Sequence, residues 1–157
     1  MNSQYFAGFF DADGTVTIEK YTYKRDYVHG PKAGKLRYAI KVQVGNVYRP
    51  VCQMYHERYG GSLYVRKTKS KTHRPIWVWH VNSLKAVAFL EDVVPYLTVK
   101  KRQAELALEF NTHMRKTWRA LQSRSLEDPE LQKIYAYRDG MHQAITSAKW
   151  IDYHSTQ

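Results

Sequence analysis

The first half of the chain contains segments in which apolar and polar residues alternate, and a helical pattern precedes each pair of these segments. Residues 4–12 form an apolar run that predicts a helix ending at Gly14, and residues 15–24 are rich in the Thr, Val, Ile and Tyr residues typical of strands. Residues 36–44 alternate strictly, which predicts a half-buried antiparallel strand with one polar, basic face. A helix follows over about 51–59, because the preceding Pro50 suits a first helical turn.

The second half repeats a strand pair and then becomes helical. Residues 62–68 and 75–81 predict a second hairpin, and a helix begins at Asn82 or Ser83 and ends near Val94. A long helix is predicted over 99–122, followed by a turn and a helix that Asp139-Gly140 interrupts before a short last helix. This order predicts an α+β fold. We expect one domain over 1–157, with a core over about 3–122 and a helical tail over about 123–157.

Positive charge is concentrated in the part of the chain that contains the hairpins. The net charge is +11, but 14 of the 25 Lys and Arg residues and only two of the 14 acids lie between Lys20 and Arg74. A polyanionic partner is the simplest reason for this segregation. Binding to a membrane surface is disfavoured, because the basic residues alternate with aromatic residues on strands and do not line an amphipathic helix.

We expect the polar strand faces to contact double-stranded DNA, since antiparallel ribbons fit the major groove. A spacing of two places side chains on one face of a sheet, although it leaves open which face of the first strand is involved. The predicted strand contacts are Thr17, Glu19, Tyr21, Arg37, Lys41, Gln43, Arg66 and Thr68, and the predicted contacts at the hairpin tips are Lys32, Lys35, Lys69 and Lys71.

Several classes of function and partner are disfavoured by what the sequence lacks. No stretch of 18 apolar residues occurs, so no membrane partner is expected. The single cysteine, Cys52, cannot form an internal disulfide and fits an intracellular, reducing compartment. The seven histidines have no metal-binding spacing, and nothing in the sequence indicates a small-molecule substrate.

The segment Phe6–Gly14, F-A-G-F-F-D-A-D-G, carries the strongest chemical signal. Asp11 and Asp13 lie at the C-terminal end of the predicted helix, where the helix dipole disfavours a carboxylate by about 0.3–1 kcal/mol. A divalent cation reverses that interaction, and one or two carboxylates with water and a substrate phosphate are the usual ligands of Mg²⁺. Acids beside a glycine also occur in ordinary turns, so an isolated D-A-D-G would leave both interpretations open.

The whole segment resembles the motif Leu-Ala-Gly-Leu-Ile-Asp-Ala-Asp-Gly that names the LAGLIDADG homing endonucleases. Phe6, Phe9 and Phe10 are the only departures, each replacing one apolar residue by another. The segment Pro95–Ala104 resembles the part of the family in which a catalytic lysine begins the last core helix. The resemblance implies an αββαββα core with a four-stranded antiparallel DNA-binding saddle, and additional C-terminal helices follow it here. It also implies a homing enzyme that makes double-strand breaks by metal-dependent hydrolysis.

The resemblance further implies roles for single residues. Asp13 and the backbone carbonyl of Ala12 would bind the divalent metal, expected to be Mg²⁺, and Asp11 would support the helix end. Lys100 matches the family's catalytic lysine. Asn46 corresponds to a residue that orders water and Arg49 to a nearby catalytic cation, although the segment V-G-N-V-Y-R-P aligns only with a shift.

A single copy of the motif predicts a homodimer that acts on a long pseudo-palindromic site. Cutting both DNA strands needs two metal sites, and the chain contains one such segment. Ala7, Gly8 and Ala12 are small residues spaced along the predicted helix, so two such helices can pack closely about a twofold axis. Asp11 is expected at the same interface.

Two other functions stay open at this point. The same fold can serve in a non-catalytic nucleic-acid-binding protein, either an RNA maturase or a DNA-binding regulator. A purely structural basic protein is the third alternative, and it leaves the Phe6–Gly14 segment unexplained. The presence of both Asp13 and Lys100 favours the endonuclease.

Overall fold

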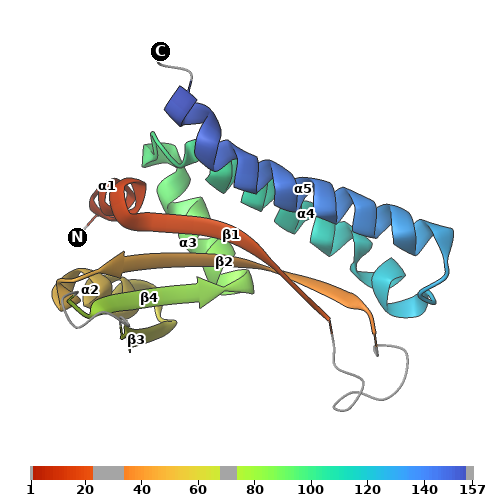
Figure 1. The fold of residues 1–157 in the computed structure, drawn as a ribbon, viewed down its shortest axis with the longest axis horizontal. Coiled ribbons are helices and arrows are strands. Elements are labelled where there is room, and N and C mark those ends of the chain that lie inside the picture. The colour runs from red at the N-terminus through yellow and green to blue at the C-terminus, as the bar shows by residue number, and fades with distance from the viewer. Residues whose placement is uncertain (1, 23–33, 68–73, 155–157) are drawn as a thin grey trace.

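Two helix–hairpin units are followed by a helix of similar length, a short 3-10 helix and two long helices (Figure 1). The computed structural model describes residues 2–22, 34–67 and 74–154. In chain order the elements are α1 (Ser3–Asp13), β1 (Gly14–Thr22), β2 (Leu36–Asn46), α2 (Arg49–Tyr59), β3 (Ser62–Arg66), β4 (Ile76–Asn82), α3 (Ser83–Val93), the short 3-10 helix η1 (Val94–Tyr96), α4 (Lys101–Ser123) and α5 (Pro129–His154). This order confirms the predicted α+β fold.

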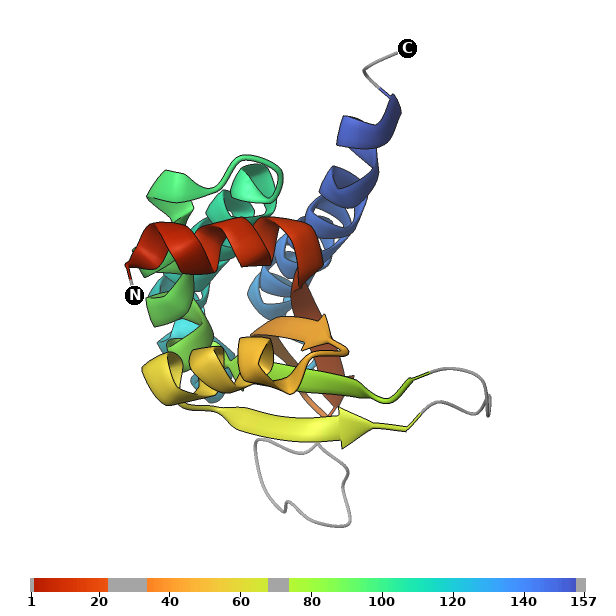
Figure 2. The same cartoon turned by 90° about the vertical axis from the view of Figure 1, so that its left-hand side faces the viewer.

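The four strands form one antiparallel sheet in the order β1-β2-β4-β3. Figure 2 shows the helices gathered on one side of this sheet. The strands alternate accordingly: Val16, Ile18, Ile40 and Val42 are buried beneath the helices, and the residues between them point to the other face. One face of the sheet is therefore core, and the opposite face carries polar side chains.

Aromatic rings fill the space between the sheet and α1, α2 and α3. Trp79 on β4 packs against Tyr55 of α2 and Phe89 of α3, with ring centroids 4.8 and 5.3 Å apart. Phe6 and Phe10 of α1 join the same cluster, and the Tyr55 hydroxyl donates to the Phe6 carbonyl over 2.6 Å. This packing fixes the position of α1 above the sheet.

Helix α1 passes directly into β1 without a loop, and Gly14 makes this junction possible. Its backbone N–H donates to the Phe10 carbonyl, and its φ of −82° is open to any residue. The space around position 14, however, admits only glycine, because a Cβ there would lie 2.1 Å from a ring carbon of Phe10. Glycine ends the helix here by allowing a close approach, and Asp13 is thereby fixed at the start of the sheet.

The predicted break at Asp139-Gly140 is wrong, because α5 runs without interruption through it. A glycine inside a helix costs only about 1 kcal/mol relative to alanine. Leu131, Tyr135 and Ile145 are buried on one side of α5 and hold both halves of the helix on the core. Despite its length, neither α5 nor any other helix in the described residues is apolar enough to cross a membrane.

Candidate functional site

Asp13 and Asn46 meet where α1 enters the sheet. Gly14 pairs with Val44 across β1 and β2, so Asp13 and the end of β2 lie side by side. The Asn46 side-chain amide donates to Asp13 Oδ2 over 2.7 Å, and its Oδ1 accepts from the Tyr48 backbone N–H over 2.8 Å. The second bond fixes which end of the amide faces Asp13. An exposed carboxylate is thus held by one oriented donor.

Asp11 joins α1 to the segment just before α4. Its two carboxylate oxygens accept from the backbone N–H groups of Thr98 and Lys100, at 2.7 and 2.9 Å. A carboxylate is unfavourable at the C-terminal end of its own helix but favourable near the N-terminus of another. Asp11 is in both places, so the approach of α4 offsets the cost at the end of α1.

Lys100 brings a positive charge to the same place. Its backbone caps α4, and its Nζ donates to the Asp11 carbonyl, one of the last carbonyls of α1. Burial lowers the pKa of the Lys100 ammonium below its ordinary value, although the Asp11 and Asp13 carboxylates act in the opposite direction. A half-buried lysine and two acids from distant parts of the sequence therefore share the end of α1.

The donor set at Asp13 fits a hard divalent cation that keeps much of its water. No three His, Cys, Asp or Glu side chains converge on a metal position within the described ranges. Mg²⁺ does not need such a cage, because one or two carboxylates with water and phosphate suffice. Asp13 is exposed, and in the described part of the chain Asn46 is the only hydrogen-bond partner of its carboxylate. The neighbouring Ala12 carbonyl lies at the same helix end, so the two groups can serve together.

Arg49 lies three residues beyond Asn46, at the start of α2. Its guanidinium carbon stands 4.8 Å from the ring centre of Trp77, a cation–π contact. Trp77 is paired with Asn46 across β2 and β4, so Arg49 is at the same end of the sheet as Asp13. The structure therefore brings Asp13, Asn46 and Lys100 together at the end of α1, and it holds Arg49 at the start of α2 near the same end of the sheet.

The open face of the sheet collects the predicted DNA-contacting side chains of β1 and β2. The pairs Thr17↔Lys41 and Tyr21↔Arg37 show that the predicted contacts of β1 and those of β2 lie on the same face. These are Thr17, Glu19 and Tyr21 on β1, and Arg37, Lys41 and Gln43 on β2. The sequence had left that choice open. Glu19 and Lys41 form a salt bridge of 2.8 Å on this face, and the Arg37 guanidinium lies 5.9 Å from the Tyr21 ring centre.

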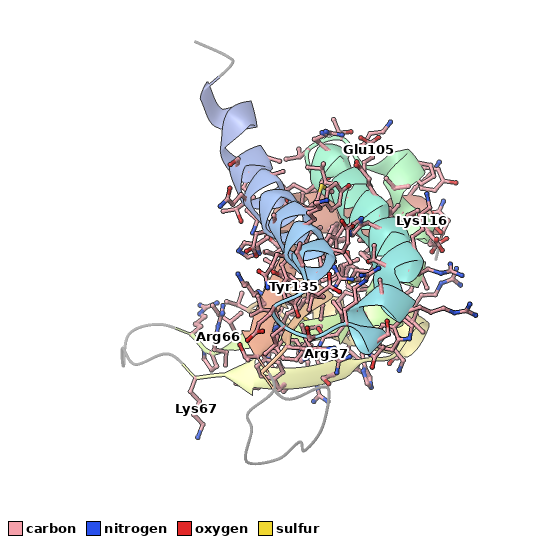
Figure 3. All side chains as sticks on the ribbon, turned by 90° about the vertical axis from the view of Figure 1, so that its right-hand side faces the viewer. Arg37, Arg66, Lys67, Glu105, Lys116 and Tyr135 are labelled. Carbon is pink, nitrogen blue, oxygen red and sulfur yellow. The ribbon has the colours of Figure 1, made fainter. Side chains whose placement is uncertain are left out.

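Arg66 extends this polar face onto β3. It is exposed and pairs with Ile76, and Figure 3 shows it beside Lys67 at the end of the strand. The remaining predicted contacts at the tips, namely Lys32, Thr68, Lys69 and Lys71, lie outside the described residues.

Neither a protein-family model nor a curated protein sequence matches this chain. Solved structures do. The homing endonuclease I-CvuI in complex with a DNA target matches with a TM-score of 0.65 and 19% identity, over 93% of this chain and 80% of that chain. The archaeal intron-encoded homing endonuclease I-Vdi141I, complexed with DNA, matches with a TM-score of 0.53 and 17% identity, over 88% and 95% of the two chains. The LAGLIDADG homing endonuclease I-GzeII, in complex with its DNA target, gives 0.58 and 19%, over 96% and 44%.

This chain has the LAGLIDADG homing endonuclease fold. The resemblance predicted from Phe6–Gly14 is thereby confirmed by the three-dimensional structure. At these identities the likeness concerns the fold.

Within the LAGLIDADG fold, the predicted position of Lys35 at an exposed hairpin tip is wrong. The side chain is only 4% exposed, and its Nζ donates to the carbonyls of Leu121 and Gln122 over 2.8 and 3.2 Å. These carbonyls belong to the last turn of α4, where a cation is stabilised by the helix dipole. Lys35 therefore caps α4 and is not available to a phosphate.

The exposed face of α1 differs in composition from the predicted one. Ala7 is completely buried in the core of its own chain, so it cannot contribute to a dimer surface as predicted. The exposed face instead carries Tyr5, Gly8 and Ala12. A Cβ at Gly8 would meet nothing within 4 Å, so this stretch of the LAGLIDADG helix is open.

Three further residues on the open sheet face were not predicted. Ser62 and Tyr64 of β3 and His80 of β4 point to the same side as Gln43, since His80 pairs with both Gln43 and Ser62. The rings of Tyr64 and His80 are 5.6 Å apart. Ser62 and Tyr64 share the parity of Arg66, so the spacing of two on β3 was the signal that could have identified them.

Proposed function

We propose that this protein is a divalent-metal-dependent, site-specific DNA endonuclease that acts as a homodimer. The observation that carries the proposal is the network of Asp13, Asn46 and Lys100 at the end of α1. A carboxylate with free ligand capacity, an oriented amide and a half-buried ammonium meet there from three separate segments. No packing role requires this combination at an exposed helix end.

Each residue in the network has a chemical role suited to phosphodiester hydrolysis. Asp13 and the Ala12 carbonyl would hold the cation, expected to be Mg²⁺, which supplies an activated water and neutralises developing phosphate charge. Asn46 holds the Asp13 carboxylate in place and orders solvent beside it. Lys100 presents a positive charge next to the phosphate, and such preorganised charges stabilise a transition state. Arg49, stacked on Trp77, adds a second cation at the same end of the sheet.

The open sheet face supports double-stranded DNA as the substrate. Gln43, Lys41 and Arg37 alternate along one side of β2, and Arg and Gln are among the commonest readers of base edges in the major groove. The neighbouring structures I-CvuI and I-Vdi141I were solved with DNA. A basic, antiparallel sheet that adjoins the Asp13 carboxylate supports DNA recognition and cleavage by the same molecule.

The exposed face of α1 supports the homodimer. A chain with one Asp13 cuts one strand at a time, so a double-strand break needs a second copy. Tyr5, Gly8 and Ala12 form an open surface with two small residues, which allows close approach of another helix. This chain matches only 44% of I-GzeII, which leaves room in that neighbour for a second unit of this size.

Cleavage of a randomised duplex library, with sequencing of the released ends, tests the proposal. With Mg²⁺ we expect ends at a defined, pseudo-palindromic sequence. Asp13→Asn should abolish cleavage but leave DNA affinity within about tenfold, because phosphate contacts dominate affinity. Glu127→Gln, an exposed acid far along the chain, is the matched control and should cut normally.

Two outcomes would reject parts of the proposal. Cleavage by Asp13→Asn at the unaltered rate would remove Asp13 from the metal site. Tight DNA or RNA binding without cleavage by the unaltered protein would favour the non-catalytic alternative, a maturase or a regulator.

A further inference from the structure

Helix α5 contacts the β1–β2 hairpin at the end opposite Asp13. The Asp139 carboxylate accepts from Lys20 Nζ at 2.8 and 2.9 Å and from the Tyr38 hydroxyl at 2.7 Å. Lys20 and Tyr38 are paired across β1 and β2, so one carboxylate ties both strands of the hairpin to α5. We call these three residues the Asp139 clamp.

Further contacts hold the same stretch of the hairpin. The Tyr135 hydroxyl accepts from the Leu36 backbone N–H over 3.2 Å, at the first residue of β2. His142 Nδ1 lies 2.8 Å from the Ile18 carbonyl on β1, and Lys35 caps α4. Figure 3 shows Tyr135 on the part of α5 that lies over the strand carrying Arg37. Helices α4 and α5 therefore contact both strands of the hairpin near the end of β1 and the start of β2.

The Lys20–Asp139 ion pair of the Asp139 clamp is too exposed to add much to global stability. The side chains of Lys20 and Asp139 are 37% and 40% exposed, and exposed ion pairs contribute only about 0–1 kcal/mol. Burial opposes ionisation of Asp139, but the hydrogen bonds from Lys20 and Tyr38 outweigh it and keep the pKa below its ordinary value. The carboxylate is thus charged at neutral pH. Apolar residues such as Leu131 and Ile145 already hold α5 on the core.

The Asp139 clamp can control the direction in which the outer ends of β1 and β2 leave the core. The next pair of residues outward, Tyr21 and Arg37, carries side chains of the open sheet face. Antiparallel strands that leave the core are free to twist and splay, and a bond across both strands from a packed helix removes that freedom. Asp13 is seven residues back along the chain from Lys20, roughly 20 Å at the rise of an extended strand. Figure 1 shows the two ends of β1 well apart.

We propose that α5 acts as a positioning element, in which the Asp139 clamp fixes the direction of the outer ends of β1 and β2, residues 20–22 and 36–38, and thereby sets sequence preference at the outer base pairs of the DNA site. The proposal rests on the proposed function. The clamp residues do not touch the cleavage network, so recognition at the outer positions and the cleavage step are separable.

Asp139→Ala tests the clamp, with Glu130→Ala as the matched control. Glu130 forms an exposed ion pair with Lys133 on the same helix, and its side chain makes no hydrogen bond or ion pair to a strand within the described residues. In the free protein, hydrogen exchange of backbone amides in residues 18–22 and 36–40 should accelerate in Asp139→Ala only. On DNA, affinity should fall at least about fivefold, and preference should relax at outer positions. The single-turnover cleavage rate at saturating DNA should match that of the unaltered protein.

Asp139→Asn separates the charge from the geometry. The amide oxygen can still accept from Tyr38 but has no charge for Lys20, so we expect an effect between those of the unaltered protein and Asp139→Ala. Unchanged exchange and unchanged outer preference in Asp139→Ala, with normal binding by the unaltered protein, would overturn the clamp alone. Failure of the unaltered protein to bind DNA would overturn the proposed function and the DNA role of α5 with it. A reduced cleavage rate at saturating DNA would also contradict the separation of the two roles.

Discussion

Gly8 offers a substitution whose effects on the single chain and on the proposed dimer have opposite signs. In the chain, Gly8 lies inside α1, and a Cβ added there meets nothing within 4 Å. Because position 8 is exposed, a leucine side chain can point into solvent with no clash at its Cβ, and it removes the entropic cost of a glycine in a helix. In the dimer, the same side chain stands between two helices that need close approach.

The two magnitudes differ enough to be measured separately. Removing a glycine from a helix interior stabilises a chain by about 0.5–1 kcal/mol, which raises the Tm of a domain of this size by roughly 1–4 °C. Overpacking a well-packed contact costs about 1–3 kcal/mol. A twofold interface contains the change twice, so the dimer loses about 2–6 kcal/mol and its Kd rises about 30-fold to 10⁴-fold.

Thermal unfolding of Gly8→Leu tests the expected gain in monomer stability, and sedimentation equilibrium tests the expected loss of dimer affinity. Unfolding is compared at a concentration at which the unaltered protein is monomeric, because association would otherwise shift the Tm. Gly140→Leu is the matched control: Gly140 also lies inside a helix, and a Cβ there also meets nothing within 4 Å. Both variants should gain stability, and only Gly8→Leu should lose the dimer and double-strand cleavage. A Gly8→Leu protein that dimerises with the unaltered Kd would refute the α1 interface.

The remaining predictions concern the site, the sheet face and acid stability. Lys100→Met should lower the single-turnover cleavage rate at least about 10²-fold, as loss of one electrostatic stabiliser does, whereas Lys101→Met at the exposed next residue should not; equal rates would place Lys100 outside the site. Gln43→Ala should change preference at one base position in each half-site of the selected DNA, and a uniform loss over all sequences would indicate a phosphate contact instead. Hydrogen bonds from Tyr59 and Ser3 hold the pKa of Asp92 below its ordinary value. A carboxyl whose pKa is lowered in the folded state stabilises the fold at pH values above its unfolded pKa, and this stabilisation is lost as the pH falls. The decrease in Tm caused by Asp92→Asn should therefore be largest at pH 7 and become smaller below about pH 4. A decrease in Tm that stays constant with pH would contradict this assignment.

The strands and their faces could be predicted from local sequence because a half-buried strand repeats every two residues. The predicted strand over 36–44 lies within the observed β2, and its inward and outward residues are as expected. The choice of face for β1 needed the register, since Thr17 gains its position by pairing with Lys41. Within β1, Val16 and Ile18 alternate with Thr17 and Glu19, but the polar residues 20–22 do not continue this alternation.

The features that local sequence did not predict depend on partners far along the chain. Lys35 reads as part of a basic loop, but its partner Leu121 is 86 residues away. Gly140 reads as a helix breaker, but buried residues on both sides of it keep α5 continuous. Ala7 reads as an interface residue by size alone, but it is completely buried in the core of its own chain. In each case tertiary packing outweighs a local preference that is worth about 1 kcal/mol.

The residues of the segment Phe6–Gly14 have distinct roles, and its three departures from the LAGLIDADG motif all lie at positions that pack against the core. Phe6 and Phe10 are buried, with ring centroids 5.0 Å from Tyr55 and Phe89, respectively. Phe9 is partly buried and packs against that core. The replaced leucine and isoleucine positions thus serve packing, and the aromatic residues of α2 and α3 provide matching surfaces.

The residues that agree with the motif serve tasks in which a particular atom or the absence of one matters. Asp11 needs two oxygens for two backbone N–H groups, Asp13 needs a carboxylate facing Asn46, and Gly14 must have no Cβ. A core accepts many combinations of apolar residues at similar volume, whereas such positions accept one or two. This asymmetry explains how a chain can share only 19% identity with I-CvuI and still have the same fold.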